Sequence, residues 1–383
     1  MKIVFDHQIF SAQTYGGIAR YFYEIYDHID KLEGMETELP LWVSNNAYLL
    51  RDGRVRSSRF FPNFNFRGRH SAMVFINNLF TLKNLRSGEF DLFHPTYYDP
   101  YFLDVIGTKP FVLTIHDMIH EKYPRYFTEK DSTVKDKRLL VEKAAHIIAV
   151  SEHTKKDIIE ILGVEASRIS VIYHGNSLPS PPQGLDMHLP SRYLLYVGPR
   201  NVYKNFNNFS KAVSILFREE SDLFLVCAGG GDWSAEERIL LDSLGIADRV
   251  YRIDVDDRSL AHLFANAEMF VFPSYYEGFG IPVLEAFACG CPVACSDTSS
   301  LPEVAGTCAE YFDPRDSESI CESIKKLLYD RERREMLVKC AMERVKLFSW
   351  ESAAKQTASV YSGVLTPHID SEVLSNSNRQ KKE

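Results

Sequence analysis

An acidic pair in the second half of the chain is the first candidate for chemistry. Glu277 and Glu285 stand eight residues apart in YYEGFGIPVLEAFACGCPV, residues 275–293, where a glycine-rich turn runs into a helical pattern. Pro282 suits the first turn of that helix. Glu285 is then placed to chelate the two hydroxyls of a ribose, and Glu277 to reach a hexose. A capped, solvated helix is the alternative, but the small apolar residues that follow predict burial around Glu285, where an unpartnered carboxylate is unfavourable.

The turn between the two acids offers backbone amides at the start of a helix, a position that favours anions. Its glycines also let a ligand approach the backbone closely. We expect these amides to bind sugar hydroxyls or phosphate oxygens. They belong to Gly278, Phe279, Gly280 and Ile281.

Two cations follow a strand pattern at the start of the second half. In YVGPRNVYKNF the strand ends at Gly198, and Arg200 and Lys204 precede the next helix. Cations at a helix N-terminus can bind a diphosphate without a metal. Two solvated surface cations are the alternative. We expect no Asp-x-Asp metal motif at a strand end, and these cations would do the work of a metal, so neither a divalent metal nor another cofactor is expected.

The first half contributes candidates at the ends of its strands. Gly16 and Gly17 open a helix in YGGIARY, where the backbone can approach a ligand. His116 ends the fourth strand and His174 the sixth, and Asp117 follows His116. A Gly-Gly pair is common and a lone histidine is more often structural. Two histidines at strand ends that face one cleft favour a functional site, with Asp117 and His174 as additional candidates.

Short apolar runs alternate with helical patterns along both halves of the chain. Such alternation predicts an α/β protein with parallel sheets covered by helices on both faces. Ligands of such sheets lie at the carboxyl ends of the strands. The expected strands are 2–6, 39–44, 91–96, 111–117, 146–151 and 169–175 in the first half, and 193–199, 222–231, 249–255, 269–274, 292–297 and 309–314 in the second.

A proline-rich connector separates the halves. Residues 176–191 include four prolines, which break any regular element. We predict two Rossmann-like domains that face each other across a central cleft. The predicted bounds are 1–178 for the N-terminal domain, 179–191 for the linker, 192–364 for the C-terminal domain and 365–383 for a disordered tail. The last helical stretch is long enough to cross back to the first domain.

Composition restricts the class of protein. The chain is 45% hydrophobic and 25% charged, as globular proteins are. Without a run of 18 apolar residues, no transmembrane helix is expected. The N-terminal MKIVFDHQIF lacks the features of a secretory signal, so a cytoplasmic location is expected. The seven cysteines fit reduced, buried thiols, and Cys289, Cys291 and Cys295 fit packing rather than metal binding.

A basic segment, residues 51–86, carries eight Lys or Arg and one acid. It is interleaved with Phe60, Phe61, Phe64 and Phe66. This combination is typical of a surface for nucleic acid or for an anionic membrane. The net charge of −8 argues against nucleic acid. A solvated loop remains the alternative to peripheral contact with the inner face of a membrane.

In their order along the chain, the motifs resemble those of the retaining glycosyltransferases of family 4, which have the GT-B fold. The resemblance covers nearly the whole chain and includes GGIARY, the His-Asp pair at 116–117, SEHTKKDI, VIYHG, VG-R-x3-K-N and the E-x7-E pair. It implies that the C-terminal domain holds a nucleotide-sugar donor and the N-terminal domain an acceptor. The implied roles are diphosphate binding by Arg200 and Lys204, ribose binding by Glu285, donor-sugar binding by Glu277 and the amides after it, contact near the reacting carbon by His116, and approach to the diphosphate by Gly16 and Gly17. His116, Glu277, Arg200 and Lys204 would be catalytic.

The opening FDHQIFSAQTYGGIARYF also resembles bacterial mannosyltransferases of O-antigen and exopolysaccharide assembly. This implies GDP-mannose as donor and a saccharide acceptor that is often lipid-linked. A UDP-sugar stays open as donor, and a nucleotide-sugar-binding protein without catalysis is an alternative. CAGGGDW lacks the GxGxxG spacing of a dinucleotide-binding oxidoreductase, and no lysine stands in a context typical of a phosphorylase cofactor. Retention could follow front-face attack or double displacement.

Overall fold

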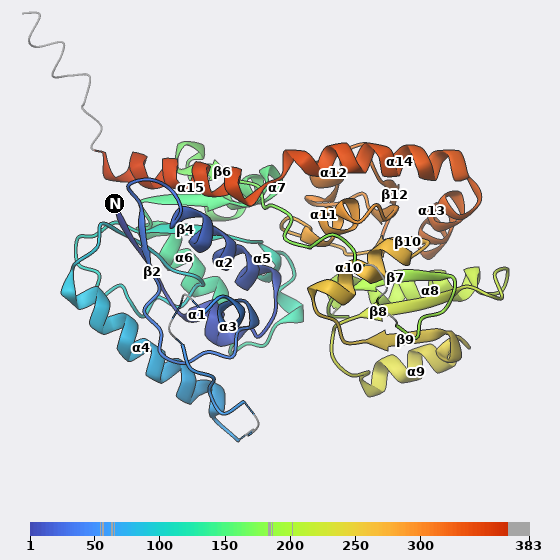
Figure 1. The fold of residues 1–383 in the computed structure, drawn as a ribbon, viewed down its shortest axis with the longest axis horizontal. Coiled ribbons are helices and arrows are strands. Elements are labelled where there is room, and N and C mark those ends of the chain that lie inside the picture. Colours follow the sequence, from blue (N-terminus) through green and yellow to red (C-terminus); the bar gives the residue numbers. More distant parts are fainter. Residues whose placement is uncertain are drawn as a thin grey trace, which may run out of the picture.

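The computed structural model describes residues 1–366 apart from 54, 56, 63, 65, 183, 184, 186 and 201. Most of the predicted tail therefore lies outside the described residues, as do Arg54 and Arg56 of the basic segment. The chain forms two α/β halves side by side (Figure 1).

The N-terminal half is built on six parallel strands. They form two three-stranded sheets, β2-β1-β3 and β4-β5-β6, and a bridge between Phe93 and Phe111 joins β3 to the strand beside it. The strands are β1 (Lys2–Phe5), β2 (Glu36–Glu38), β3 (Leu92–His94), β4 (Val112–Ile115), β5 (His146–Ala149) and β6 (Ile169–Val171). The helices are α1 (Gln8–Ala12), α2 (Gly17–Ile29), α3 (Ala47–Asp52), α4 (Arg69–Ser87), α5 (Ile119–Lys122), α6 (Thr133–Lys143) and α7 (Glu152–Leu162).

The expected strand at 39–44 is wrong. The second strand is β2, which ends at Glu38, and residues 39–44 have only an isolated bridge from Val43 to Ser58. Pro40 removes one ladder donor. The amides of Trp42 and Val43 donate instead to the Asn77 side chain, at 3.0 and 3.1 Å. A polar side chain on α4 thus satisfies the backbone that a neighbouring strand would have paired.

The C-terminal half is a single parallel sheet with the order β12-β11-β10-β7-β8-β9. Each of the six strands expected here overlaps an observed one. They are β7 (Tyr193–Val197), β8 (Phe224–Ala228), β9 (Val250–Ile253), β10 (Met269–Phe272), β11 (Val293–Ser296) and β12 (Glu310–Phe312). The helices are α8 (Phe206–Leu216), α9 (Ala235–Ser243), α10 (Asp257–Asn266), α11 (Ile281–Ala288), α12 (Leu301–Ala305), α13 (Ser317–Tyr329) and α14 (Arg331–Arg344).

The last helix, α15 (Trp350–Leu365), returns to the N-terminal half and lies along it (Figure 1). It packs against α2 and β5. The Tyr361 hydroxyl lies 2.6 Å from Nδ1 of His94, and Trp350 donates to Ser177 at 2.6 Å. The chain therefore crosses between the halves twice, once through the proline-rich connector and once before α15.

The cysteines only partly meet the expectation of reduced thiols. Cys308, between α12 and β12, forms a disulfide with Cys340 on α14. The two residues are 32 positions apart, and only the packing of α14 beside this turn brings them together. Cys291 and Cys295 are free and belong to the core, where burial raises the pKa of both thiols. These two are packing residues, as expected.

The basic segment includes α4, and its aromatic side chains divide between core and surface. The expectation that Phe60 faces the surface is wrong, because it is 7% exposed and packs with Val43 and Met73. Phe61 and Phe64 are exposed by 53% and 64%. Across the part of the chain that is described, no helix combines the length and apolar character needed to cross a bilayer.

Candidate active site

The loop 275–280 leaves the carboxyl end of β10 and leads into α11, as the sequence predicts. A second turn holds its backbone in place. The Glu277 amide donates to Ser299 Oγ at 3.0 Å, and Ser300 Oγ lies 2.9 Å from the carbonyls of both Glu277 and Phe279. The loop is therefore positioned by hydrogen bonds before any ligand arrives, which favours binding.

Gly278 is required because the two halves touch at this point. A Cβ at this position would lie 1.7 Å from the carbonyl oxygen of His116. Gly280 has a φ of +104°, and a Cβ there would meet Leu301 at 2.8 Å. Within the described residues, the amides of Gly278, Phe279 and Gly280 have no acceptor, so they can donate to a ligand.

Side chains at the start of helix α7 in the first half donate hydrogen bonds to the same loop. Ser151 Oγ donates to the Gly278 carbonyl at 2.7 Å, and Thr154 Oγ1 donates to it at 3.1 Å. Glu303 of the second half accepts from the amides of Glu152 and His153, at 2.6 and 3.1 Å, and so caps α7. The motif SEHTKKDI thus supplies contacts between the domains, a role that its sequence alone does not reveal.

Glu277 and Lys204 form an ion pair. Lys204 ends the short 3-10 helix η3 (Val202–Lys204), and its Nζ lies 2.7 Å from Glu277 Oε1. The side chains are 14% and 11% exposed, so the pair is largely withdrawn from solvent. Each of these two residues is expected to contact the donor. In this structure they bind each other at the carboxyl ends of the strands, where ligands of parallel sheets lie.

Arg200 contacts the glycine turn after β8 and a residue of α9. Its guanidinium donates to Glu237 at 2.8 Å and to the carbonyls of Gly229, Gly231 and Asp232, at 3.0 to 3.1 Å. It also lies 4.3 Å from the centre of the Trp233 ring, and its side chain is 2% exposed. These contacts hold the glycine turn after β8. Like Lys204, Arg200 would have to exchange present contacts in order to bind a diphosphate, so the paired role expected for it stays a prediction.

Glu285 lies within α11 and is 5% exposed. Its Oε1 accepts a hydrogen bond from Arg20 Nη1 at 3.1 Å, across the domain interface. Burial raises the pKa of Glu285, and the charge of Arg20 opposes that rise. Arg20 carries no signal of its own in the sequence beyond a charge on the largely apolar buried face of α2, where Asp27 is a second buried charged residue.

The Gly16–Gly17 turn precedes Arg20 and faces the same interface. A Cβ at Gly17 would make ordinary contact with Ile281 Cδ1, at 3.6 Å. The first turn of α2 is therefore next to the first turn of α11. This places two segments together that are more than 260 residues apart in the chain.

The two candidate histidines are buried close to each other. His116 and His174 are 6% and 4% exposed, their rings are 6.3 Å apart, and Tyr21 contacts both. Among the described residues, none bonds to their ring nitrogens. Burial lowers the pKa of His174 to about 3 and that of His116 well below its usual range. Both imidazoles are therefore neutral near neutral pH.

His174 and Asp117 also make contacts that stabilise the fold. The His174 ring packs against Phe279 at 4.6 Å and stacks on Trp350 at 5.5 Å, where the chain crosses between the halves. Asp117 Oδ1 accepts from the Ile119 amide at 3.0 Å, and so fixes the start of α5. The site residues that the fold brings together are thus His116, Lys204, Glu277, the amides after it, Gly17 and Glu285.

Acidic groups that could attract a metal have other partners. The expectation that no Asp-x-Asp motif follows a strand is wrong, because Asp254 and Asp256 form an Asp-Val-Asp after β9. However, Asp254 pairs with Arg252 at 2.6 Å and Asp256 caps α10 through the Ser259 amide. Such capping uses the carboxylate locally.

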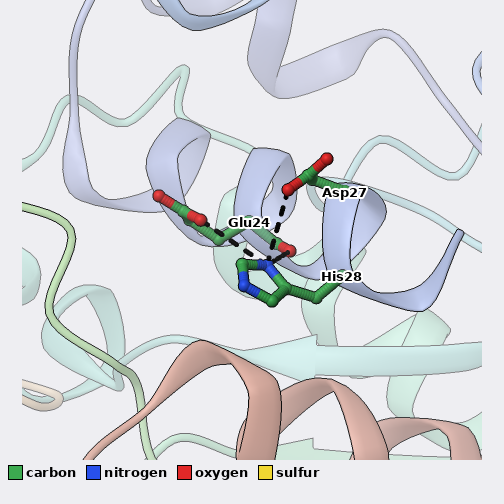
Figure 2. Close-up of side chains that lie close together, drawn as sticks. All are labelled: Glu24, Asp27 and His28. Atoms are coloured by element: carbon green, nitrogen blue, oxygen red, sulfur yellow. Dashed lines mark hydrogen bonds and ion pairs between the residues drawn. The ribbon is translucent and has the colours of Figure 1, made fainter. Parts of the chain in front are cut away.

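In the described residues, one three-member group has metal-like spacing: Glu24, Asp27 and His28 on α2 (Figure 2). Lys31 Nζ lies 2.5 Å from Asp27, and His28 Nδ1 donates to the Glu24 carbonyl at 2.8 Å. Glu24, Asp27 and His28 therefore belong to an ion-pair cluster with Lys31.

Comparisons with known proteins identify the family of the chain. Residues 15–178 match the family model described as Glycosyltransferase Family 4, and residues 185–344 match Glycosyl transferases group 1. The chain is 31% identical to O-antigen chain mannosyltransferase B of Escherichia coli over 281 residues, which cover 70% of this chain and 72% of that one. The chain belongs to glycosyltransferase family 4. This family 4 glycosyltransferase is also 31% identical to the O-antigen chain mannosyltransferase RfbU of Salmonella typhimurium over 216 residues, 56% of this chain and 60% of that one.

Solved structures show the same fold at lower identity. Sucrose-phosphate synthase from Thermosynechococcus elongatus has a TM-score of 0.75 at 20% identity, with 95% of this chain and 99% of that chain covered. WaaG, described as a glycosyltransferase involved in lipopolysaccharide biosynthesis, has a TM-score of 0.68 at 15% identity, with 95% and 100% covered. The GT-B architecture predicted for this family 4 glycosyltransferase is confirmed.

Proposed function

We propose that this glycosyltransferase transfers mannose from GDP-mannose to a saccharide of O-antigen or exopolysaccharide assembly, with retention of the anomeric configuration. The observation that carries the proposal is the fixed loop 277–280, whose unpaired amides lie beside Lys204 and next to the buried, neutral His116. The mannosyltransferase names of two relatives at 31% identity support the donor. A UDP-sugar is the second candidate, since a structure of the same fold is described in complex with UDP and glucose.

In this proposal the donor separates the Lys204–Glu277 pair. Lys204 binds the diphosphate, and Glu277 accepts hydrogen bonds from hydroxyls of the donor sugar. The loop amides and the N-terminus of α11 add donors for the charge that develops on the leaving group. His116, as a neutral imidazole, can exchange hydrogen bonds with the sugar near its reacting carbon. Arg200 acts indirectly, because it fixes the turn after β8.

The transfer breaks the bond between the anomeric carbon and the diphosphate oxygen and forms a bond to the acceptor oxygen. The acceptor proton passes to the departing diphosphate if attack occurs from the front face. A double displacement through an enzymic carboxylate is the alternative route. No metal is needed in either case, since Lys204 and the amides offset the leaving-group charge.

We further propose that the acceptor is lipid-linked and that the N-terminal half contacts the inner face of an anionic membrane. The contact surface, here called the α4 surface, is defined by Phe61, Phe64, Phe75, Leu79 and Phe80, which are 41% to 64% exposed. Arg59, Arg67, Lys83 and Arg86 belong to the same segment and are exposed. Exposed apolar groups next to basic ones are typical of peripheral membrane contact.

The test is a transfer assay with the purified full-length enzyme. GDP-mannose and UDP-glucose are supplied separately with lipid-linked acceptor oligosaccharides, and the product is analysed for mass and anomeric configuration. We expect an α-linked mannosyl product from GDP-mannose and almost none with Glu277→Gln. Turnover of UDP-glucose in preference to GDP-mannose, or an inverted product, would overturn the proposal.

A further inference from the structure

Arg20 connects the two halves of the molecule at the donor side of the interface. It lies in the first turn of α2, directly after the Gly16–Gly17 turn. Its guanidinium bonds Glu285 on α11 at 3.1 Å and Asp257 at the start of α10 at 2.5 Å. Its Nε donates to the Tyr48 hydroxyl at 3.2 Å. One side chain of the first half thus contacts two carboxylates of the second.

The contact is largely shielded from water. The side chains of Arg20 and Glu285 are 7% and 6% exposed, and that of Asp257 is 20% exposed. An arginine or a carboxylate is seldom buried without a partner, because losing the partner leaves an unpaired charge. Although burial opposes it, the charges of Glu285 and Asp257 raise the pKa of Arg20, so the guanidinium stays charged. Arg20 is therefore a permanent positive charge beside Glu285.

Glu285 needs that charge to act as a carboxylate. Burial raises its pKa, and the negative charge of Asp257 raises it further, while Arg20 is the cation that lowers it. Another ionisable group near Glu285 is the Cys289 thiol directly after α11, whose pKa burial raises to about 12. Arg51 lies 2.9 Å from Asp257 and neutralises part of its charge. Without Arg20, Glu285 would be protonated over a wider range of pH.

The geometry also leaves Glu285 able to bind a ligand. Arg20 contacts Oε1, so Oε2 can accept a hydrogen bond from a hydroxyl. A carboxylate must be ionised and fixed in orientation to chelate two neighbouring ribose hydroxyls. Arg20 supplies both conditions from the opposite domain.

We propose that Arg20 is a positioning residue of the donor site, which holds Glu285 in the orientation that binds the nucleotide ribose and, through Asp257, links ribose binding to the approach of the two domains. The proposal rests on the ribose role of Glu285 in the proposed function. It adds a residue of the N-terminal half that acts on the nucleotide without touching it.

The test measures GDP affinity by calorimetry for the full-length enzyme and for Arg20→Met, Arg20→Lys, Glu285→Gln and the double variant Arg20→Met/Glu285→Gln. Removal of Arg20 should weaken GDP binding by about 10- to 100-fold at neutral pH. The loss should shrink as the pH rises from about 6 to about 9, because Glu285 regains its charge. Arg20→Lys should restore part of the affinity. Arg331→Met, which removes an exposed arginine whose side chain is 82% exposed, is the control for loss of charge.

The double variant separates the two hypotheses. If Arg20 acts through Glu285, Arg20→Met should cost little more in the Glu285→Gln background. Unchanged GDP affinity in Glu285→Gln would overturn the ribose role itself. If GDP affinity falls in Glu285→Gln and falls further in the double variant, with no dependence on pH, only the role of Arg20 would be overturned. Should Arg20→Met fail to fold, as judged by circular dichroism, the same cycle with Arg20→Lys decides the question.

Discussion

Lys204 Nζ lies 2.7 Å from the Glu277 carboxylate, so two residues expected to bind adjacent parts of one donor, its diphosphate and its sugar, bind each other. The pair joins the end of η3 to the loop after β10. A ligand that carries both negative phosphate and neutral hydroxyls can replace both contacts at once. A ligand with only one of these features leaves one charge unpaired in a largely buried place, which is unfavourable. In the proposed function, the pair would therefore favour a sugar diphosphate over a simple sugar or a simple phosphate.

Lys204→Met and Arg200→Met form a matched pair of substitutions. Lys204→Met should lower kcat by about 10²- to 10³-fold, since a charged contact to the leaving group is lost. Arg200→Met should instead lower the free energy of unfolding by about 2–3 kcal/mol, since it leaves Glu237 and the turn carbonyls without their donor. Steady-state kinetics and urea unfolding of both variants measure this difference. If Arg200→Met lowers kcat as much as Lys204→Met does and leaves the free energy of unfolding unchanged, Arg200 would be assigned to diphosphate binding.

Gly278→Ala should separate catalysis from folding. The added Cβ would lie 1.7 Å from the His116 carbonyl, so the domains cannot approach as they do here. We expect kcat/KM to fall by at least about 10²-fold with the secondary structure unchanged. Gly363→Ala is the control, because a Cβ there has nothing within 4 Å. Normal activity in Gly278→Ala would mean that this contact is absent during turnover.

The buried His174 predicts a particular loss of stability in acid. Its pKa falls from 6.5 in the unfolded chain to about 3 in the folded protein, so the unfolded chain binds a proton first as the pH falls. The contribution of His174 is complete above pH 6.5 and is lost progressively as the pH approaches about 3. His174→Gln should reduce the pH dependence of unfolding by up to about 1.4 kcal/mol per pH unit in that window. Identical pH profiles would show that His174 is solvated or charged in the folded protein.

Chelation should leave activity unchanged. The proposed leaving-group contacts are Lys204 and backbone amides, and Asp254 and Asp256 are engaged by Arg252 and the start of α10. Initial rates are compared before and after dialysis against EDTA, with magnesium and manganese added back. A loss that either metal restores would contradict metal-independent transfer.

The α4 surface should bind anionic vesicles at low salt. Each basic residue near such a surface contributes about 1 kcal/mol, and salt weakens the attraction. Co-sedimentation is compared for wild type, for a variant with Arg59, Arg67, Lys83 and Arg86 changed to Ser, and for a variant with Phe75 and Leu79 changed to Ser. The control changes Ile239 and Leu347 to Ser, since these are 68% and 72% exposed elsewhere. Equal binding by all variants, or none by wild type, would contradict the membrane contact.

Local patterns in the sequence determined the elements and the loop that carries the site. The period of apolar residues sets a strand or a helix, and Glu277, Gly278 and Glu285 follow from a glycine turn that opens a helix at a strand end. These features depend on neighbours a few positions away, so they can be predicted from the chain alone. The parallel sheets and the two Rossmann-like domains follow from the repeated alternation of the same two patterns, and the GT-B fold was implied by the resemblance to family 4.

Only the tertiary structure decided which partners the charged and sulfur groups take. Three cations form ion pairs across long distances in the chain: Arg200 with Glu237, Lys204 with Glu277, and Arg20 with Glu285. Cys308 forms a disulfide with Cys340. Nothing in the local sequence distinguishes these partners from other acids or cysteines. Trp42 and Val43 likewise bond Asn77 instead of a strand. Each pairing joins residues at least 32 positions apart, and in each the long-range packing brings the two partners within reach of each other.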